Sequence, residues 1–93
     1  MRLTGKCKVD FEKWFLKQWD IKKLEYFYFL TSSMQYGVYV DFFESEDIRI
    51  NIHSEIDYIQ AYVNDNDLGN HFQFIKEARA EAFKKSNEIY NLR

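Results

Sequence analysis

The spacing of apolar residues changes twice along this chain, and these changes constrain its fold more than any other feature. Ile48, Ile50 and Ile52 alternate with polar residues, which is the period of a half-buried strand. Before and after this region, apolar residues recur every three or four positions, the period of an amphipathic helix. The pattern predicts an α+β fold: N-terminal helices, a small antiparallel sheet of two to three strands, and a C-terminal amphipathic helix.

A first helix is expected over residues 5–19, with Thr4 as its N-cap. Asp20 interrupts the helical pattern, and residues 21–30 predict either a short second helix or an irregular connector. The apolar stripe expected for the first helix consists of Cys7, Phe11, Trp14, Phe15 and Gln18 or Trp19.

The segment SSMQYGVYVDFFES, residues 32–45, predicts a further helix. Ser32 and Gln35 match the capping-box pattern, with a polar side chain at each end of the first turn. Gly37 costs a helix about 1 kcal/mol relative to alanine, but the cap and the spacing outweigh this cost. The expected inward stripe is Met34, Val38 and Phe42, with Tyr39 and Phe43 beside it, and Tyr36 and Asp41 are left at the surface.

Strand-like and loop-like segments follow, and the chain closes with an amphipathic helix over residues 75–91. The expected order is a strand over 48–53, a bend at 54–55, a strand over 56–63, a loop over 64–70 and a short third strand over 71–74. The inward stripe expected for the last helix is Ile75, Ala78, Ala82, Phe83, Ile89 and Tyr90.

Aromatic residues are unusually frequent for a single domain of 93 residues. The chain has nine Phe, seven Tyr and two Trp, which together make up 19% of it. This is more than one small core readily buries, so we expect several of these side chains at the surface. Exposed aromatic residues are typical of protein interfaces.

Patterns typical of enzymes and cofactor sites are missing from the sequence. The three glycines are isolated and make no phosphate loop, and one Cys with two distant His residues matches no common metal site. DNDLGN lacks the spacing of a calcium loop. Cys7 lies on an apolar stripe, and His53 and His71 are expected to be ordinary surface residues. We therefore expect no enzyme activity, no cofactor and no metal.

The composition also indicates the cellular compartment in which such a chain functions. A single cysteine forms no internal disulfide, which favours a reducing compartment. No apolar run is long enough for a membrane span, and the first residues lack the apolar core of a signal peptide. We expect a cytoplasmic protein that does not contact a membrane.

Charge is unevenly distributed along the chain. Residues 41–70 carry eight acidic side chains and one basic one, Arg49, whereas residues 1–40 carry seven basic and four acidic ones. An acidic region of this kind attracts basic partners and repels phosphate. The alternative is that these acids only solubilise loops and sheet edges.

Three segments resemble small uncharacterised proteins of Bacteroidota phages and prophages: LTGKCKVDFEKWF (3–15), SMQYGVYVDFFES (33–45) and EARAEAFKKSNEIYN (77–91). In that group a Thr-Arg pair precedes the last helix, whereas Phe74 and Ile75 stand there in this chain. The resemblance implies a phage-encoded accessory protein that works in a bacterial cytoplasm, and it assigns no functional residues.

The first functional hypothesis is a binding protein that inhibits a host protein, in the manner of anti-CRISPR or other anti-defence proteins. The expected target is a host protein with a basic surface, for which we name a CRISPR nuclease. Aromatic anchors within a charged rim would form the interface. The residues expected to bind this partner are Asp57, Tyr58, Tyr62, Asp65 and Asp67.

Two alternatives come from other functional classes. The chain could self-associate as a homodimer, with LEYFYFL (24–30) or an exposed hairpin edge as the seam. It could also bind RNA, because the order of elements resembles the double-stranded-RNA-binding domain. Acidic loops and a last helix of mixed charge argue against direct nucleic-acid binding.

Overall fold

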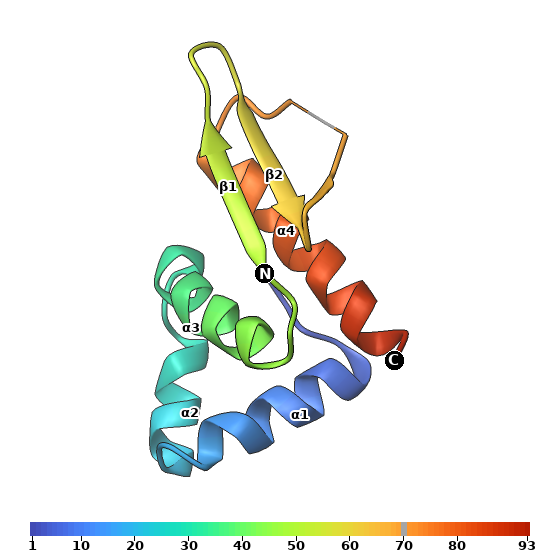
Figure 1. Ribbon diagram of the computed structural model, residues 1–93. Coiled ribbons are helices and arrows are strands. Elements are labelled where there is room, and N and C mark those ends of the chain that lie inside the picture. The colour runs from blue at the N-terminus through green and yellow to red at the C-terminus, as the bar shows by residue number, and fades with distance from the viewer. Residues whose placement is uncertain (70) are drawn as a thin grey trace.

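The computed structural model describes residues 1–69 and 71–93, in which four helices and three strands form an α+β fold (Figure 1). The order confirms the expected fold class. The elements are α1 (Gly5–Leu16), α2 (Ile21–Tyr28), α3 (Ser32–Ser45), β1 (Ile50–Ser54), β2 (Ile59–Val63), β3 (Asn66–Asp67) and α4 (Ile75–Asn91).

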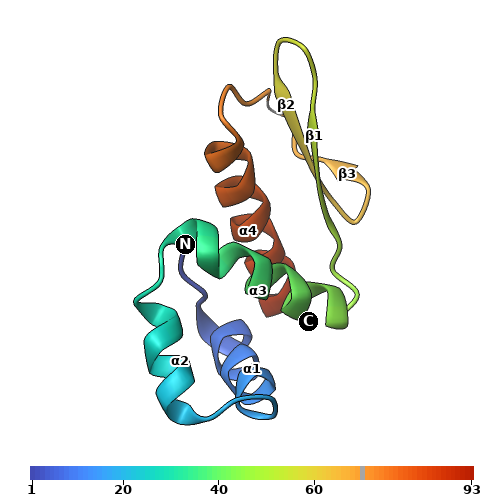
Figure 2. The ribbon, with the colours of Figure 1, turned by 90° about the vertical axis from the view of Figure 1, so that its left-hand side faces the viewer.

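The three strands form an antiparallel sheet in the order β1-β2-β3, and α4 packs along one of its faces. Figure 2 shows α4 on one side of the sheet and the three N-terminal helices gathered at the end where β1 begins. Within the described residues, no helix is both long and apolar enough to cross a membrane.

The first helix is shorter than predicted and ends at Leu16. The chain turns after it because Asp20 begins a new helix: its carboxylate accepts a hydrogen bond from the backbone N–H of Lys23 at 3.0 Å. Residues 21–30 therefore contain a helix and not an irregular connector. Trp19 lies beyond α1, and its ring packs on Phe15 at a centroid distance of 4.7 Å.

The N-terminus of α1 is capped by a different helix. Thr4 occupies the N-cap position, as predicted, but its side chain makes no capping hydrogen bond. Asn91 of α4 supplies the bond instead, since its Oδ1 accepts from the backbone N–H of Cys7 at 2.8 Å. Asn87 Oδ1 accepts from the backbone N–H of Thr4 at 3.1 Å. The first turn of α1 is thus tied to the last turns of α4.

The helix α3 forms as predicted, but a different residue caps it. Thr31 is the N-cap, and its hydroxyl accepts from the backbone N–H of Met34 at 3.4 Å. Gln35 is not part of a capping box: it is buried and donates to the carbonyl oxygens of Phe27, at 3.1 Å, and Tyr28, at 3.4 Å. These carbonyls end α2, so Gln35 caps α2 from α3.

Gln35 takes the place at the inward face of α3 that was predicted for Met34, whereas Tyr39, Phe42 and Phe43 are buried as predicted. Met34, expected inside, is 63% exposed. Tyr36, expected at the surface, is half-buried beneath the Arg79 guanidinium, which lies 5.0 Å from the centre of its ring. Asp41 is exposed, as predicted. The side chains that α3 buries are Gln35, Tyr39, Phe42 and Phe43.

Aromatic rings form the centre of the core. The ring of Phe11 in α1 lies 4.9 Å from that of Tyr39 and 5.4 Å from that of Phe42. Tyr39 in turn lies 4.8 Å from Phe83 of α4. Tyr39 therefore joins the N-terminal helices to the layer formed by α4 and the sheet.

Both long strands begin later than predicted. Ile48 is fully buried but precedes β1, which begins at Ile50. The bend lies at the tip of the hairpin, around Ile56 and Asp57, where the backbone N–H of Glu55 donates to the carbonyl of Tyr58 at 2.8 Å. β2 therefore begins at Ile59 and not at residue 56.

The predicted third strand over residues 71–74 is wrong. Phe72 makes only an isolated bridge to Ile59, and the third strand, β3, lies inside the predicted loop. Asn64 and Asp65 both have positive φ, 52° and 67°, so they form a two-residue hairpin turn that returns the chain along β2. The last residue of the predicted loop, Asn70, lies outside the described residues.

The last helix has the predicted bounds. Phe74 is its N-cap residue and makes no side-chain capping bond. Ile75, predicted to face inward, is exposed, and Ile89 is only partly buried. Ser86 is buried instead, and its hydroxyl donates to the carbonyl of Ala82 at 2.8 Å. The side chains that α4 buries are Ala78, Ala82, Phe83, Ser86 and Tyr90.

Candidate binding surface

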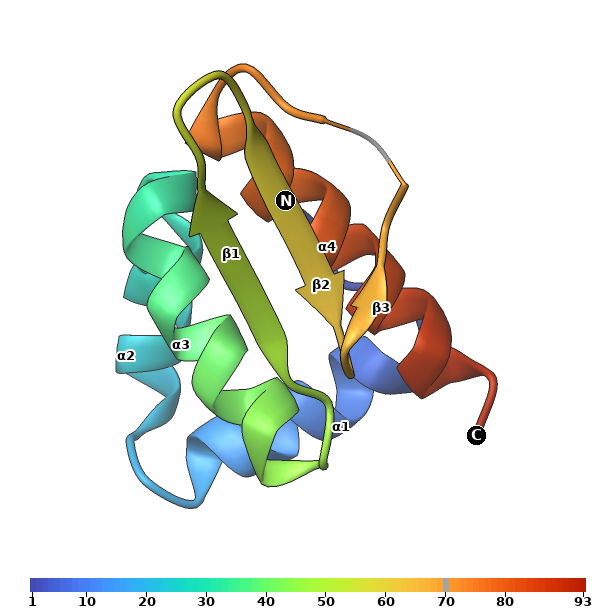
Figure 3. The ribbon, with the colours of Figure 1, turned by 45° about the horizontal axis from the view of Figure 1, so that its top comes forward.

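One face of the sheet carries no helix. Figure 3 shows α4 behind the sheet and no helix in front of it. Ala61 and Val63 point from β2 into the core and are buried. Side chains alternate along a strand, so the neighbours of these two residues point to the opposite, uncovered side. We call this side the outer face; its residues are Asn51, His53, Tyr58, Gln60, Tyr62 and Asp67.

The strand register brings the outer-face residues side by side. Asn51 pairs with Tyr62, and His53 pairs with Gln60. Tyr62 also pairs with Asp67 of β3. The Gln60 amide donates to the Asp67 carboxylate, so a hydrogen bond between polar side chains links β2 to β3 on this surface.

Each predicted tyrosine anchor packs against a histidine. Tyr58 stacks on His71 with a centroid distance of 4.0 Å and an interplanar angle of 13°. Tyr62 meets His53 edge to face, at 5.5 Å and 88°. These contacts hold the two tyrosines in fixed positions, which lowers the entropy lost when a partner binds. His71 was expected to be an ordinary surface residue, and its distance in sequence from Tyr58 gave no sign of this contact.

The three predicted acids do not form one cluster. Asp57 lies at the hairpin tip and Asp65 in the β2–β3 turn, so they stand about 25 Å apart at opposite ends of β2. A carboxylate oxygen of Asp65 lies 4.0 Å from a guanidinium nitrogen of Arg49, within the range of an ion pair. Asp67 already accepts from Gln60 and, at 2.8 Å, from the backbone N–H of Gly69. Asp57 and Asp65 are thus the acids more available to a partner.

The acidic region 41–70 divides between two places in the fold. Its first half belongs to the C-terminal part of α3 and the turn after it. There a carboxylate oxygen of Glu46 lies 3.8 Å from a guanidinium nitrogen of Arg93. Its second half surrounds the outer face. Arg49 is the single basic residue of the region. The outer face therefore has acids at both of its ends and aromatic rings between them.

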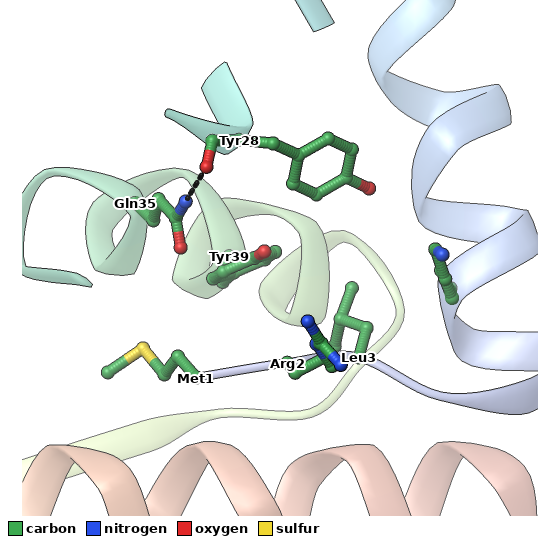
Figure 4. Close-up of a pocket in the computed structure, with 7 residues that line it drawn as sticks. Met1, Arg2, Leu3, Tyr28, Gln35 and Tyr39 are labelled. Atoms are coloured by element: carbon green, nitrogen blue, oxygen red, sulfur yellow. Dashed lines mark hydrogen bonds between the residues drawn. The ribbon is translucent and has the colours of Figure 1, made fainter. Parts of the chain in front are cut away.

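A cavity of about 480 Å³ lies between the N-terminal segment and helices α2 and α3 (Figure 4). The Tyr28 hydroxyl, at its wall, donates to Glu12 at 2.7 Å, and burial and this bond raise the pKa of Tyr28. Burial also raises the pKa of Tyr39 to about 12. Both phenols therefore stay protonated at neutral pH and are poor proton acceptors.

The single thiol is equally unreactive. Cys7 is fully buried, and burial, followed by the charges of Asp10 and Glu46, raises its pKa to about 12. It is held as a thiol, as a small apolar residue would be. Within residues 1–69 and 71–93, no group of three or more His, Cys, Asp and Glu side chains is placed to hold a metal ion.

A second apolar surface lies on the N-terminal helices. Tyr26 is 69% exposed and Phe29 is 87% exposed, which confirms that several aromatic residues reach the surface. Tyr26 borders a shallow groove of about 290 Å³. The groove is lined by Phe15, Trp19, Lys23, Tyr26, Phe27, Leu30 and Val38.

Comparisons with protein-family models, with curated proteins and with solved structures find no match to this chain.

Proposed function

We propose that this protein is a non-enzymatic binding protein that occupies a basic surface of another protein through the outer face of its sheet. The observation that supports this proposal is that no helix of the described chain lies in front of the sheet, on the side to which strand alternation assigns Tyr58 and Tyr62. Both rings are positioned by histidines, and acids flank them. Aromatic anchors within a charged rim are the usual composition of a binding hot spot.

The charge of this surface favours a basic partner. Asp57 and Asp65 at its two ends would meet Lys or Arg side chains, which speeds association and sets orientation. A groove built for nucleic acid is basic and would fit such a face. Together with the resemblance to phage proteins, this makes a host defence nuclease, and a CRISPR nuclease in particular, the target that we propose.

The proposal is tested by capture from a Bacteroidota lysate with three forms of the protein. These are wild type, a Tyr58→Ala/Tyr62→Ala variant, and a control variant, Tyr26→Ala/Phe29→Ala, that removes exposed aromatic rings from α2. We expect a nuclease-resistant protein partner that binds wild type and the α2 variant alike. The outer-face variant should bind it at least about 30-fold more weakly, as for loss of hot-spot residues.

A charge variant then separates the electrostatic attraction of the two acids from the packing of the two tyrosines. Asp57→Lys/Asp65→Lys should slow association, most strongly at low salt, and leave circular dichroism unchanged. The captured protein, purified, should lose its activity when wild type is added; for a CRISPR nuclease the readout is DNA cleavage. Capture that depends on α2 and not on the outer face would overturn the proposal. Loss of the captured protein after nuclease treatment would overturn it as well.

A further inference from the structure

The outer edge of β1 is unpaired. β1 is an edge strand of the sheet and pairs only with β2 in the described chain. The ladder bonds at its two ends, Asn64 N–H to Arg49 and Glu55 N–H to Tyr58, show that odd-numbered residues of β1 face β2. In an antiparallel pair the alternate residues direct their backbone groups the other way. The free N–H and C=O groups are therefore those of Ile50, Ile52 and Ser54.

This edge lacks the usual protection against pairing. Natural edge strands are commonly guarded by lysine, proline, inward-pointing charge or a bulge. The strand INIHS has no Lys, Pro or charged carboxylate, and its register with β2 is continuous over all five residues. An unguarded edge of this kind is suited to accepting another strand.

We propose that β1 pairs with β1 of a second copy of this chain, antiparallel and about a two-fold axis at Ile52. In this register Ile52 lies opposite Ile52 of the second copy, and Ile50 lies opposite Ser54. All the free backbone groups of the edge are then used, in about six hydrogen bonds. The same surface serves both copies, as a two-fold dimer requires.

The charges beside β1 agree with this register. Arg49 lies opposite Glu55 of the second copy, because each is three residues from Ile52, on opposite sides of it. The symmetry forms this pair twice. Arg49 and Glu55 are both exposed, and they share the outer side of the strand with Asn51 and His53. Opposite charges directly across a strand pair stabilise it, and like charges destabilise it.

The hairpin tip provides an apolar contact for the same arrangement. Ile56, at the tip, is 100% exposed. The register carries the tip of one copy toward the start of β1 in the other, where a cavity of about 210 Å³ lies between α3 and β1. Its walls are formed by Val40 and Ile50 together with Glu44, Arg49 and Asn51, so Ile56 would meet the two apolar side chains within a mixed lining.

The dimer would join two sheets into one continuous sheet with both outer faces on the same side. This inference rests on the backbone geometry of β1 and does not depend on the proposed function. It concerns the sheet edge, whereas the proposed partner binds the sheet face, so failure of either leaves the other intact.

The first test uses wild-type protein across a wide range of concentration. We expect the mass in solution to rise from the 11.4 kDa of one chain to twice that value. Amide hydrogen exchange should slow with concentration at Ile50, Ile52 and Ser54. Asn51 and His53, whose N–H groups already face β2, are the internal control and should be protected at every concentration.

The second test reverses the charges. Arg49→Glu and Glu55→Arg should each weaken the dimer about tenfold, because each places like charges together twice. Mixing the two variants should restore the dimer, since both contacts then join opposite charges. The double variant should dimerise alone. A defect in folding would not be repaired by mixing.

Three results would overturn the proposal: a monomer at every concentration, exchange at Ile52 that does not change with concentration, or a dimer indifferent to both charge variants. A dimer that is lost with Phe29→Asp, and not with the charge variants, would place the seam on α2 instead.

Discussion

Asn91, in the last turn of α4, accepts a hydrogen bond from the backbone N–H of Cys7 in the first turn of α1. A helix N-cap normally comes from the residue just before the helix, and here it comes from 84 residues away. The backbone is shaped for this approach. Gly5 has φ of 57°, and a Cβ at that position would lie 3.2 Å from the side-chain oxygen Oδ1 of Asn91.

Asn91→Ala should therefore destabilise the fold through α1 as well as α4. We expect a loss of about 0.5–2 kcal/mol in the free energy of unfolding, the usual range for removing an N-cap. Chemical denaturation measures this loss. Lys85→Ala, at an exposed position of the same helix, is the control and should change stability little. Equal stability of the two variants would contradict the capping role.

Gln35→Ala should be costly because it removes the side-chain donor of the Tyr28 carbonyl and leaves the Phe27 carbonyl with only the backbone N–H of Leu30. We expect a loss of about 1–3 kcal/mol in the free energy of unfolding, as for a buried group left unpaired. The melting temperature should fall by several degrees. Gln73→Ala, at an exposed site, should melt close to wild type. A small effect at Gln35 would mean that water replaces its amide.

The hydrogen bond between Tyr90 and Asp10 makes the stability of the fold depend on pH in the acid range. The Tyr90 hydroxyl donates to the Asp10 carboxylate at 2.7 Å, and this bond, with a smaller contribution from Lys6, lowers the pKa of Asp10. A carboxyl whose pKa is lower in the folded state stabilises the fold above its unfolded pKa of about 3.9. That stabilisation is lost as the pH falls through the folded value.

Tyr90→Phe should reduce stability near neutral pH and have a smaller effect at about pH 3, below the unfolded pKa of Asp10, where the stabilisation from this carboxylate begins to be lost. Urea denaturation at both pH values measures the difference. Tyr26→Phe, which removes an exposed hydroxyl, should leave the pH dependence of wild type unchanged. An equal loss at both pH values would show that Tyr90 acts by packing alone.

Cys7 should resist thiol reagents as long as the protein is folded. With a pKa of about 12, it holds about a thousandfold less thiolate at pH 8 than a free cysteine does. Labelling in native buffer should be slow and should become fast in urea. The control is Val9→Cys in a Cys7→Ala chain, where the new thiol lies at an exposed position of α1 and should label rapidly. Similar native rates at the two positions would contradict the burial of Cys7.

Local patterns predicted the helices better than the sheet. The bounds of α4 follow from a regular apolar stripe, and α3 follows from the spacing of its apolar residues, although Thr31 and not the predicted Ser32 caps it. The third strand does not follow from the sequence because Asn64 and Asp65 fit a loop as well as a tight hairpin turn, whose positive φ both residue types tolerate. The role of Gln35 does not follow from a local pattern because its partners, the last carbonyls of α2, belong to another helix.

The candidate surface was predicted only in part. Alternation along β2 placed Tyr58 and Tyr62 on one side, and the structure confirms that they share a face. The contact of Tyr58 with His71 depends on how the chain after β3 returns to the sheet. The separation of Asp57 from Asp65 depends on the length of β2. Neither follows from a local pattern.

The contact between Asn91 and Cys7 also affects the order of events during synthesis. While a nascent chain still lacks its last helix, α1 has no cap for its first turn, and the buried ring of Tyr39 lacks its contact with Phe83. Contacts between such distant residues form late and slow the search for the native state. The N-terminal half should therefore remain loosely ordered on the ribosome until α4 has emerged and packed against it.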